Sequence, residues 1–219
     1  MSYKQVKYFQ NLEDYTAAYK IARADWEANP SLKWPKNTIA WLLIRMMKFN
    51  ARAYAYNKFL QQLEEFCQLA IPEDESKLWE SIAWPIRDIV LDSYQMQWFT
   101  PEFGDKLFDT IRNMPFHKPS ESYSAMGKAF IRLGGLWPRL AEFIEWWGFD
   151  NFTDYDYRRY PENGTLTSLA EKVFEAYIVA LKRVQREPSK SFYDGLEYLA
   201  LRSKEQADKV YRILNFDKK

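Results

Sequence analysis

A spacing of 43 residues recurs in the first half of the chain and limits the folds open to it. The tripeptide Ile-Ala-Trp occurs at 39–41 and again at 82–84, and the loop prolines Pro30, Pro72 and Pro115 follow at intervals of 42 and 43 residues. One helical hairpin cannot bury both of its apolar faces, so repeated hairpins stack and share a continuous core. The spacing therefore predicts a stack of helical hairpins.

Each predicted unit consists of a helix that carries the tryptophan, a second helix, and an exit that contains proline. The second helices are expected over roughly 52–70 and 101–114. A third unit is expected from Ser122 onward. In that unit Ala129 and Leu133 take the places of apolar residues in the two earlier units, which are Leu43, Met47, Ile86 and Val90.

Helical periodicity and helix-ending residues are frequent along the chain. Apolar residues with a period of 3.6 form one face between 12 and 26, and Asn29-Pro30 ends that helix. Ser168, with a glutamate three residues later, forms a capping box, and Thr100-Pro101 supplies an N-cap followed by proline. Strand-type alternation is hard to find, and seven glycines are few for a turn-rich all-β fold. The chain is therefore predicted to be all-α.

The first unit carries a recognisable helix signature. Asp14-Tyr15, Ala18 and the Asn29-Pro30 exit are similar to the second helix of a tetratricopeptide repeat, although Arg45 replaces a glycine usual in the first helix. The resemblance implies a tetratricopeptide-like α-solenoid of antiparallel helical hairpins. Residues 1–115 would hold degenerate repeats, and 116–219 would continue as a helical region with a C-terminal cap, in one continuous domain.

A series of short motifs follows in order along most of the chain. The motifs are Ala-Trp at 40–41 and 83–84, Ser-Glu-Ser-Tyr-Ser at 120–124, Glu-Trp-Trp-Gly-Phe at 145–149, Asn-Phe at 151–152, Asp-Tyr at 154–155, Ser-Leu-Ala-Glu-Lys at 168–172 and Ala-Tyr at 176–177. Together they resemble the tetratricopeptide-like helical domain of bacterial TOTE-type conflict-system proteins. The resemblance implies a non-catalytic assembly module that acts beside helicase, primase-like and nuclease domains, and it offers no catalytic residue.

Composition excludes several classes of protein. Lys and Arg number 31 against 30 Asp and Glu, so the whole chain is not a basic nucleic-acid coat or an acidic tail. One Cys and one His exclude an intramolecular disulfide and a His/Cys zinc site. No apolar run reaches the ~18 residues that span a bilayer, and no export signal is recognisable, so a cytoplasmic protein without membrane contact is expected.

Few residues suggest catalysis. His117 lies in a loop between prolines, and Cys67 follows two glutamates that disfavour a thiolate. The carboxylates of Asp150, Asp154, Asp156 and Glu162 are the densest acidic group, but Arg158 and Arg159 neutralise them and their spacing matches no calcium loop. We therefore expect no enzyme activity, no metal site and no cofactor.

Two regions are candidates for contact with a partner protein. Trp98 lies between predicted helices, and an exposed aromatic residue there would mark a binding surface. The second candidate is the aromatic and basic run that contains Tyr155, Tyr157, Arg158, Arg159 and Tyr160. Tyr and Arg dominate interface hot spots, but these tyrosines could equally cover the preceding Trp146-Trp147 helix. Trp26, Trp41 and Trp84 are expected in the core.

Charge is mildly segregated, which keeps an alternative function open. Residues 182–219 hold ten bases against six acids, and Lys182, Arg183 and Arg186 lie near Tyr193 and Tyr198. Bases interleaved with aromatic residues are typical of nucleic-acid binding, and a solvated capping helix gives the same composition. The favoured function is protein–protein interaction as a scaffold module, and the alternative is a nucleic-acid-associated accessory protein that uses these basic C-terminal helices.

Overall fold

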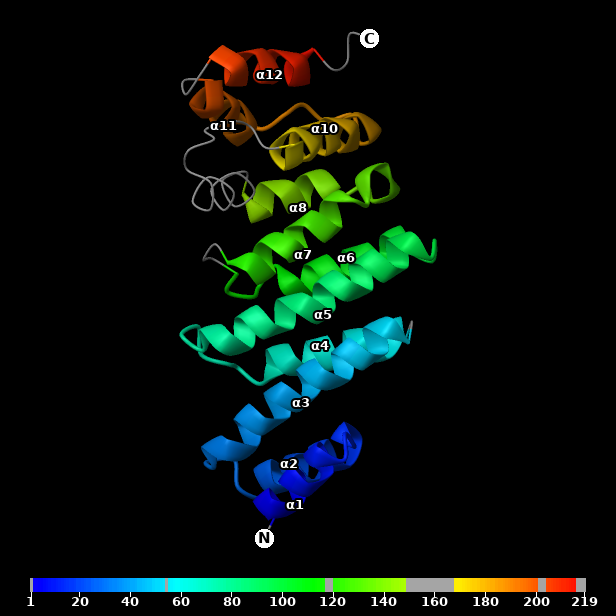
Figure 1. Cartoon of the computed structure of the whole chain (residues 1–219), viewed down its shortest axis with the longest axis vertical. Helices are drawn as coiled ribbons and strands as arrows, with labels where there is room; N and C mark the ends of the chain where they lie inside the picture. Colours follow the sequence, from blue (N-terminus) through cyan, green and yellow to red (C-terminus); the bar gives the residue numbers. More distant parts are fainter. Residues whose placement is uncertain (1, 54, 117–119, 149–167, 201–203, 216–219) are drawn as a thin grey trace.

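The computed structural model describes residues 2–53, 55–116, 120–148, 168–200 and 204–215, and all regular structure in these ranges is helical. Figure 1 shows an elongated molecule in which the helices follow one another in chain order from the N-terminus to the C-terminus. Within the same ranges, no helix combines the length and apolarity that a membrane crossing requires. The prediction of an all-α chain is confirmed for these residues.

The helices are ordinary in length except for two long ones. The elements are α1 (Ser2–Asn11), α2 (Tyr15–Ala28), α3 (Lys33–Arg52), α4 (Tyr56–Gln68), α5 (Ser76–Gln95), α6 (Pro101–Ile111), α7 (Glu121–Ile131), the short 3-10 helix η1 (Gly134–Leu136), α8 (Leu140–Trp147), α10 (Ser168–Arg183), α11 (Lys190–Ala200) and α12 (Lys204–Leu214). The second helix of the first predicted unit begins at Tyr56 rather than near 52, because α3 continues through Arg52.

The two long helices share one register. α3 and α5 are both 20 residues long, and their first residues Lys33 and Ser76 are 43 residues apart, as are their last residues Arg52 and Gln95. α3 packs on α5 and α5 packs on α7, while α4 contacts both α3 and α6. The apolar positions expected to be equivalent in the three units are all at most 1% exposed, namely Leu43, Met47, Ile86, Val90, Ala129 and Leu133.

Local residues explain where the helices begin and end. Asp14 and Thr100 cap α2 and α6 by accepting backbone N–H groups of Ala17 (2.9 Å) and Phe103 (3.2 Å). Four helices end with a non-glycine residue in the left-handed region, where φ lies between 46° and 58°. These residues are Glu13, Ala70, Gln97 and Gln185, each two positions beyond the last helical residue. A chain with seven glycines thus closes these helices with other residues.

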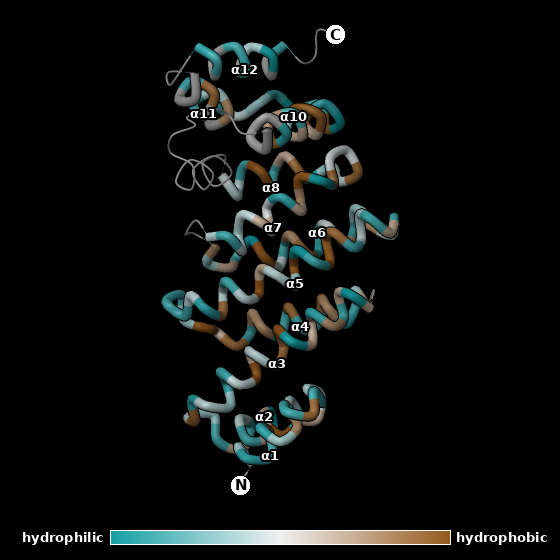
Figure 2. The backbone as a smooth tube through the Cα atoms, in the orientation of Figure 1, coloured by the Kyte–Doolittle hydropathy of each residue, from teal (hydrophilic) through white to brown (hydrophobic). Residues whose placement is uncertain are grey.

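The prediction that Trp41 lies in the core is wrong, because its side chain is 39% exposed. Residues two positions apart on a helix point about 160° apart, and Ile39 and Leu43 are fully buried on the other side of α3. Trp26 and Trp84 are half-buried, and Trp26 packs against the core. In Figure 2 hydrophobic and hydrophilic residues alternate along α3 and α5, as expected for helices with one buried side.

An aromatic cluster forms the core where α6, α7 and α8 meet. Trp137 is fully buried, and its ring contacts those of Phe108, Phe130 and Phe143 at centroid distances of 5.6–5.9 Å. The Trp137 indole N–H donates to the Asp105 carboxylate at 2.9 Å. Gly104 of α6 lies directly beneath this ring, since a Cβ atom there would come within 2.8 Å of the indole nitrogen and 2.6 Å of Phe99.

Replacing Gly104 by alanine should therefore lower the free energy of unfolding by about 1–3 kcal/mol, although alanine is the better helix former. The reason is that Trp137 cannot retreat without losing its bond to Asp105. Urea unfolding followed by circular dichroism measures the change. Lys106→Ala, an exposed position of the same helix, should change stability by less than about 0.5 kcal/mol. A Gly104→Ala protein as stable as the parent would contradict the packing.

Candidate protein-binding groove

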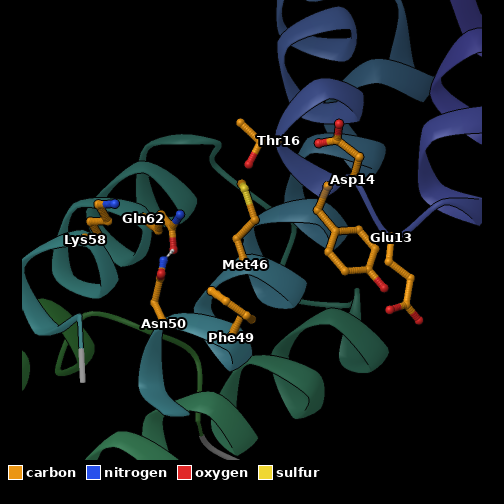
Figure 3. A pocket seen from close by; sticks show the side chains of 9 residues that line it. Glu13, Asp14, Thr16, Met46, Phe49, Asn50, Lys58 and Gln62 are labelled. Atoms are coloured by element: carbon orange, nitrogen blue, oxygen red, sulfur yellow. Dashed lines mark hydrogen bonds between the residues drawn. The ribbon is translucent and has the colours of Figure 1, made fainter. Parts of the chain in front are cut away.

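The end of α3 is left partly uncovered because its neighbour α2 is shorter. α3 has 20 residues and α2 has 14, which correspond to lengths of about 30 Å and 21 Å. The two helices pack together, and α2 begins only at Tyr15, after the Asp14 cap. A groove of about 410 Å³ therefore opens between the start of α2, the last turns of α3 and the first half of α4 (Figure 3). Its lining residues are Glu13, Asp14, Tyr15, Thr16, Met46, Phe49, Asn50, Lys58 and Gln62.

Phe49 gives this groove an apolar surface. Its side chain is 71% exposed, the largest value among the large hydrophobic residues of the described chain, and Met46 lies one turn before it, half-buried. Full burial of a phenylalanine side chain is worth about 1.5–3 kcal/mol. Because most of the Phe49 ring stays in water, folding does not gain most of that free energy. Covering the ring with another apolar group would gain it.

The equivalent place on α5 has a different chemistry. The 43-residue offset places Met46 and Phe49 opposite Ile89 and Asp92, and Ile89 is fully buried. A charged residue therefore stands on α5 where α3 exposes an aromatic one. The exposed aromatic side chain of the groove is therefore not repeated at the equivalent position of α5.

A pair of amides lies beside the apolar surface. Asn50 is 8% exposed, and its Nδ2 donates to Oε1 of Gln62 on α4 at 2.7 Å (Figure 3). An amide side chain has both a carbonyl acceptor and two N–H donors. After this bond the pair still has the carbonyl oxygen of Asn50 and the amino group of Gln62. These are the groups that pair with the N–H and C=O of a peptide backbone.

Charges of opposite sign stand on the two rims. Glu13 and Asp14 lie at the corner before α2, and Lys58 lies on α4 (Figure 3). The Asp14 carboxylate is already engaged as the cap of α2. Glu13 and Lys58 are exposed, so they are available for ion pairs with a partner.

Polar contacts join α2 and α4, two of the helices that line the groove, beyond the groove itself. Glu65 of α4 accepts a hydrogen bond from the Tyr19 hydroxyl of α2 and pairs with Arg23 at 3.3 Å. Burial and the bond to Glu65 raise the pKa of Tyr19, so the phenol remains protonated and keeps donating. The width of the groove is thus fixed by contacts outside it.

A second pocket of about 350 Å³ lies between α4 and α6 and includes Cys67. Burial, together with the negative charge of Glu64, raises the pKa of the Cys67 thiol to about 11. A thiol with that pKa carries almost no thiolate near pH 7, so it is a poor nucleophile. Among the described residues, no group of three or more His, Cys, Asp or Glu side chains could hold a metal ion.

The Trp98 side chain lies at the contact between α4 and α6. Its ring stacks on Tyr56 of α4 at 5.6 Å and contacts Phe103 of α6 at 5.4 Å, and it is only half-exposed. It therefore packs α4 against α6 and does not stand free. The other predicted contact residues, Tyr155, Tyr157, Arg158, Arg159 and Tyr160, lie outside the described residues, as do His117, Asp150, Asp154, Asp156 and Glu162.

The C-terminal bases make contacts within the chain. The Arg183 guanidinium donates to the carbonyl oxygen of Gly135 in η1. Arg186 pairs with Glu145 of α8, and the same carboxylate accepts from the Tyr177 hydroxyl. Two of the three cations predicted to face nucleic acid therefore hold α10 against its neighbours.

Sequence patterns did not identify the groove, although a signal was present. Aligning the two long helices by their 43-residue offset puts an aromatic residue, Phe49, opposite an aspartate, Asp92. A charged residue at this position of α5 indicates that the position lies outside the core, so an aromatic residue there on α3 is a candidate for an exposed contact.

Comparison of the chain with protein-family models, with curated proteins and with solved structures finds no match in any of the three.

The raised pKa of Cys67 predicts slow alkylation that accelerates with pH. With iodoacetamide at pH 8, Cys67 should react at least about tenfold more slowly than a free thiol of ordinary pKa. Its rate should rise steadily from pH 7 to pH 10, because the thiolate fraction still increases below a pKa of about 11. Mass spectrometry of the labelled protein measures the rate.

Glu64→Gln serves as the comparison, since removing this negative charge should lower the pKa of the thiol and speed the reaction. A rate that levels off by pH 8 would identify an activated cysteine and contradict the assignment of Cys67 to packing.

Proposed function

We propose that the protein is a non-catalytic scaffold that binds a segment of another protein in the groove beside Phe49. The observation that carries the proposal is an aromatic side chain 71% exposed in the body of a helix, next to the part-buried amide pair of Asn50 and Gln62. Interface hot spots are aromatic residues in well-packed settings, and amides beside them fix the path of a bound chain.

The architecture supports this role. We infer a tetratricopeptide-like α-solenoid of antiparallel hairpins, because α3, α5 and α7 pack in series while α4 contacts α6 alongside them. The common 43-residue register of α3 and α5 is expected for such units. Stacked hairpins present extended surfaces to peptides and helices, and their helix ends form the walls of grooves.

An extended peptide fits the groove better than a reacting substrate does. One apolar side chain of the peptide would cover Phe49 and Met46, while its backbone pairs with Asn50 and Gln62. The charged groups on the rims are Glu13, Asp14 and Lys58, and Asp14 is occupied as a helix cap. Such a set can orient a ligand by charge, but it supplies no nucleophile paired with a base. We therefore propose binding without catalysis and without a cofactor.

The resemblance to TOTE-type conflict-system proteins gives the proposal a context. It supports an assembly role in the cytoplasm of a bacterium, beside separate enzymes of such a system. The partner would then be one of those proteins, held through a short segment.

Phe49→Gln should abolish capture of the partner while leaving the fold intact. Glutamine keeps the helix and removes the ring, so the free energy of unfolding should change by less than about 0.5 kcal/mol. Loss of a hot-spot side chain weakens binding by about 30-fold or more. The measurement is affinity capture from nuclease-treated host lysate with the parent and the variant in parallel, followed by mass spectrometry.

Tyr211→Gln is the matched control, because Tyr211 is 64% exposed on α12, and Figure 1 shows α12 at the C-terminal end of the molecule, away from α2, α3 and α4. A protein captured by the parent and by Tyr211→Gln, but not by Phe49→Gln, supports the proposal. Addition of that protein should also slow hydrogen exchange in 46–50 and 56–62. Equal capture by all three proteins would contradict the assignment of the groove.

A further inference from the structure

The exposed side of α3 carries a row of cations without acidic residues. All five charged residues of this helix are basic, namely Lys33, Lys36, Arg45, Lys48 and Arg52. Trp34, Trp41, Arg45, Lys48 and Arg52 fall within about 60° of one another around the helix axis. These five residues are named the α3 stripe. It extends about 27 Å along the helix, at 1.5 Å per residue.

Two aromatic rings, Trp34 and Trp41, precede the three cations on this face. Trp41 is 39% exposed, and Trp34 lies two turns before it, half-buried. Tyr3 of α1, 50% exposed, meets Trp34 edge to face at 5.2 Å, and the Lys7 ammonium lies 5.6 Å from the Tyr3 ring. Aromatic rings and a positive charge therefore also lie together near the N-terminal end of the stripe.

The neighbouring helix repeats the motif in part. Trp84 on α5 is equivalent to Trp41 under the 43-residue offset, and the Arg87 guanidinium lies over its ring at 4.6 Å. α3 packs directly on α5, so the helix next to the stripe also carries an aromatic residue paired with a cation.

Two of the three acidic residues of α5, Asp88 and Asp92, lie near arginines, and the third, Glu80, is exposed. Asp88 forms an ion pair with Arg87. Burial and the charge of Asp88 raise the pKa of Asp92, and the positive charges of Arg52 and Arg87 oppose that shift. Within the described residues, Arg45 and Lys48 enter no ion pair, so their charge remains available to a partner.

We propose that the α3 stripe binds single-stranded nucleic acid, with a base stacked on Trp41 and backbone phosphates on Arg45 and Lys48. Aromatic platforms beside a basic track are the combination that holds single strands without reading sequence. A duplex keeps the faces of its bases hidden, so it cannot use the rings. An acidic protein segment would use the cations but has no need of exposed indoles.

This inference rests on residues other than the groove lining, although Arg45 and Lys48 directly precede Met46 and Phe49 of the groove in the chain. It also moves the nucleic-acid surface from the C-terminal helices, whose Arg183 and Arg186 are engaged within the chain, to α3.

Fluorescence anisotropy with a labelled oligothymidine of about 20 nucleotides tests the inference on the full chain. Binding should weaken with salt with a log–log slope of about −2, the value for about three single-strand phosphates. Trp41→Ala should weaken binding by about 5- to 100-fold, and Trp41→Tyr should restore most of it, because stacking needs only a ring. Arg45→Glu with Lys48→Glu should reduce both the affinity and the salt slope.

Lys106→Glu with Arg132→Glu is the matched charge control, since it reverses two exposed cations outside both the stripe and the groove and should change the affinity by less than the stripe reversals. The duplex of the same length should bind more weakly than the single strand.

Three results would overturn the inference. They are no binding of oligothymidine at low salt, binding that is insensitive to Trp41→Ala, and equally tight binding of a poly-glutamate peptide that depends on Arg45 and Lys48 but not on Trp41. The last result would assign the stripe to an acidic protein segment instead.

Discussion

The contact between the two long helices, α3 and α5, determines how the surfaces of the molecule are arranged. Each helix buries one side in the common core, with Leu43 and Met47 on α3 and Ile86 and Val90 on α5. Because the two helices share a register, their remaining sides are held in fixed relation. The groove beside Phe49 and the α3 stripe are thus two parts of the surface that α3 keeps outside this contact.

The groove and the α3 stripe each leave an aromatic side chain exposed, so the stability of the fold must come from contacts elsewhere in the chain. Phe49 and Trp41 leave apolar area in water that folding could have buried. The aromatic cluster around Trp137 and the carboxylate contacts of Glu65 and Glu145 hold the neighbouring helices in place. Helices held in place in this way can leave aromatic rings exposed without the chain collapsing onto them.

Sequence patterns predict the helices better than they predict the surfaces. The 43-residue offset of Ile-Ala-Trp correctly relates α3 to α5, and the caps at Asp14 and Thr100 follow from local side-chain chemistry. The same tripeptide misled the assignment of Trp41, since a repeated motif fixes register and not which side of the helix is buried.

Long-range contacts explain the remaining differences. The basic C-terminal residues were read as a free surface, but Arg186 meets Glu145, which lies 41 residues earlier in the chain. Likewise the groove depends on α2 being shorter than α3, a relation between two helices that no single motif encodes. Charge composition does not distinguish arginines that form ion pairs within the chain from arginines that remain unpaired. Only the packing of the helices shows that Arg186 is paired, whereas Arg45 forms no ion pair within the described residues.

Small-angle X-ray scattering of the free protein measures most directly whether the hairpins stack in an extended array. A compact chain of 219 residues has a radius of gyration of about 17 Å. A stack in chain order, as in Figure 1, should give a clearly larger radius and an asymmetric distance distribution with a long tail. A radius near 17 Å with a symmetric distribution would mean that the helices fold into a globule, and would contradict the solenoid.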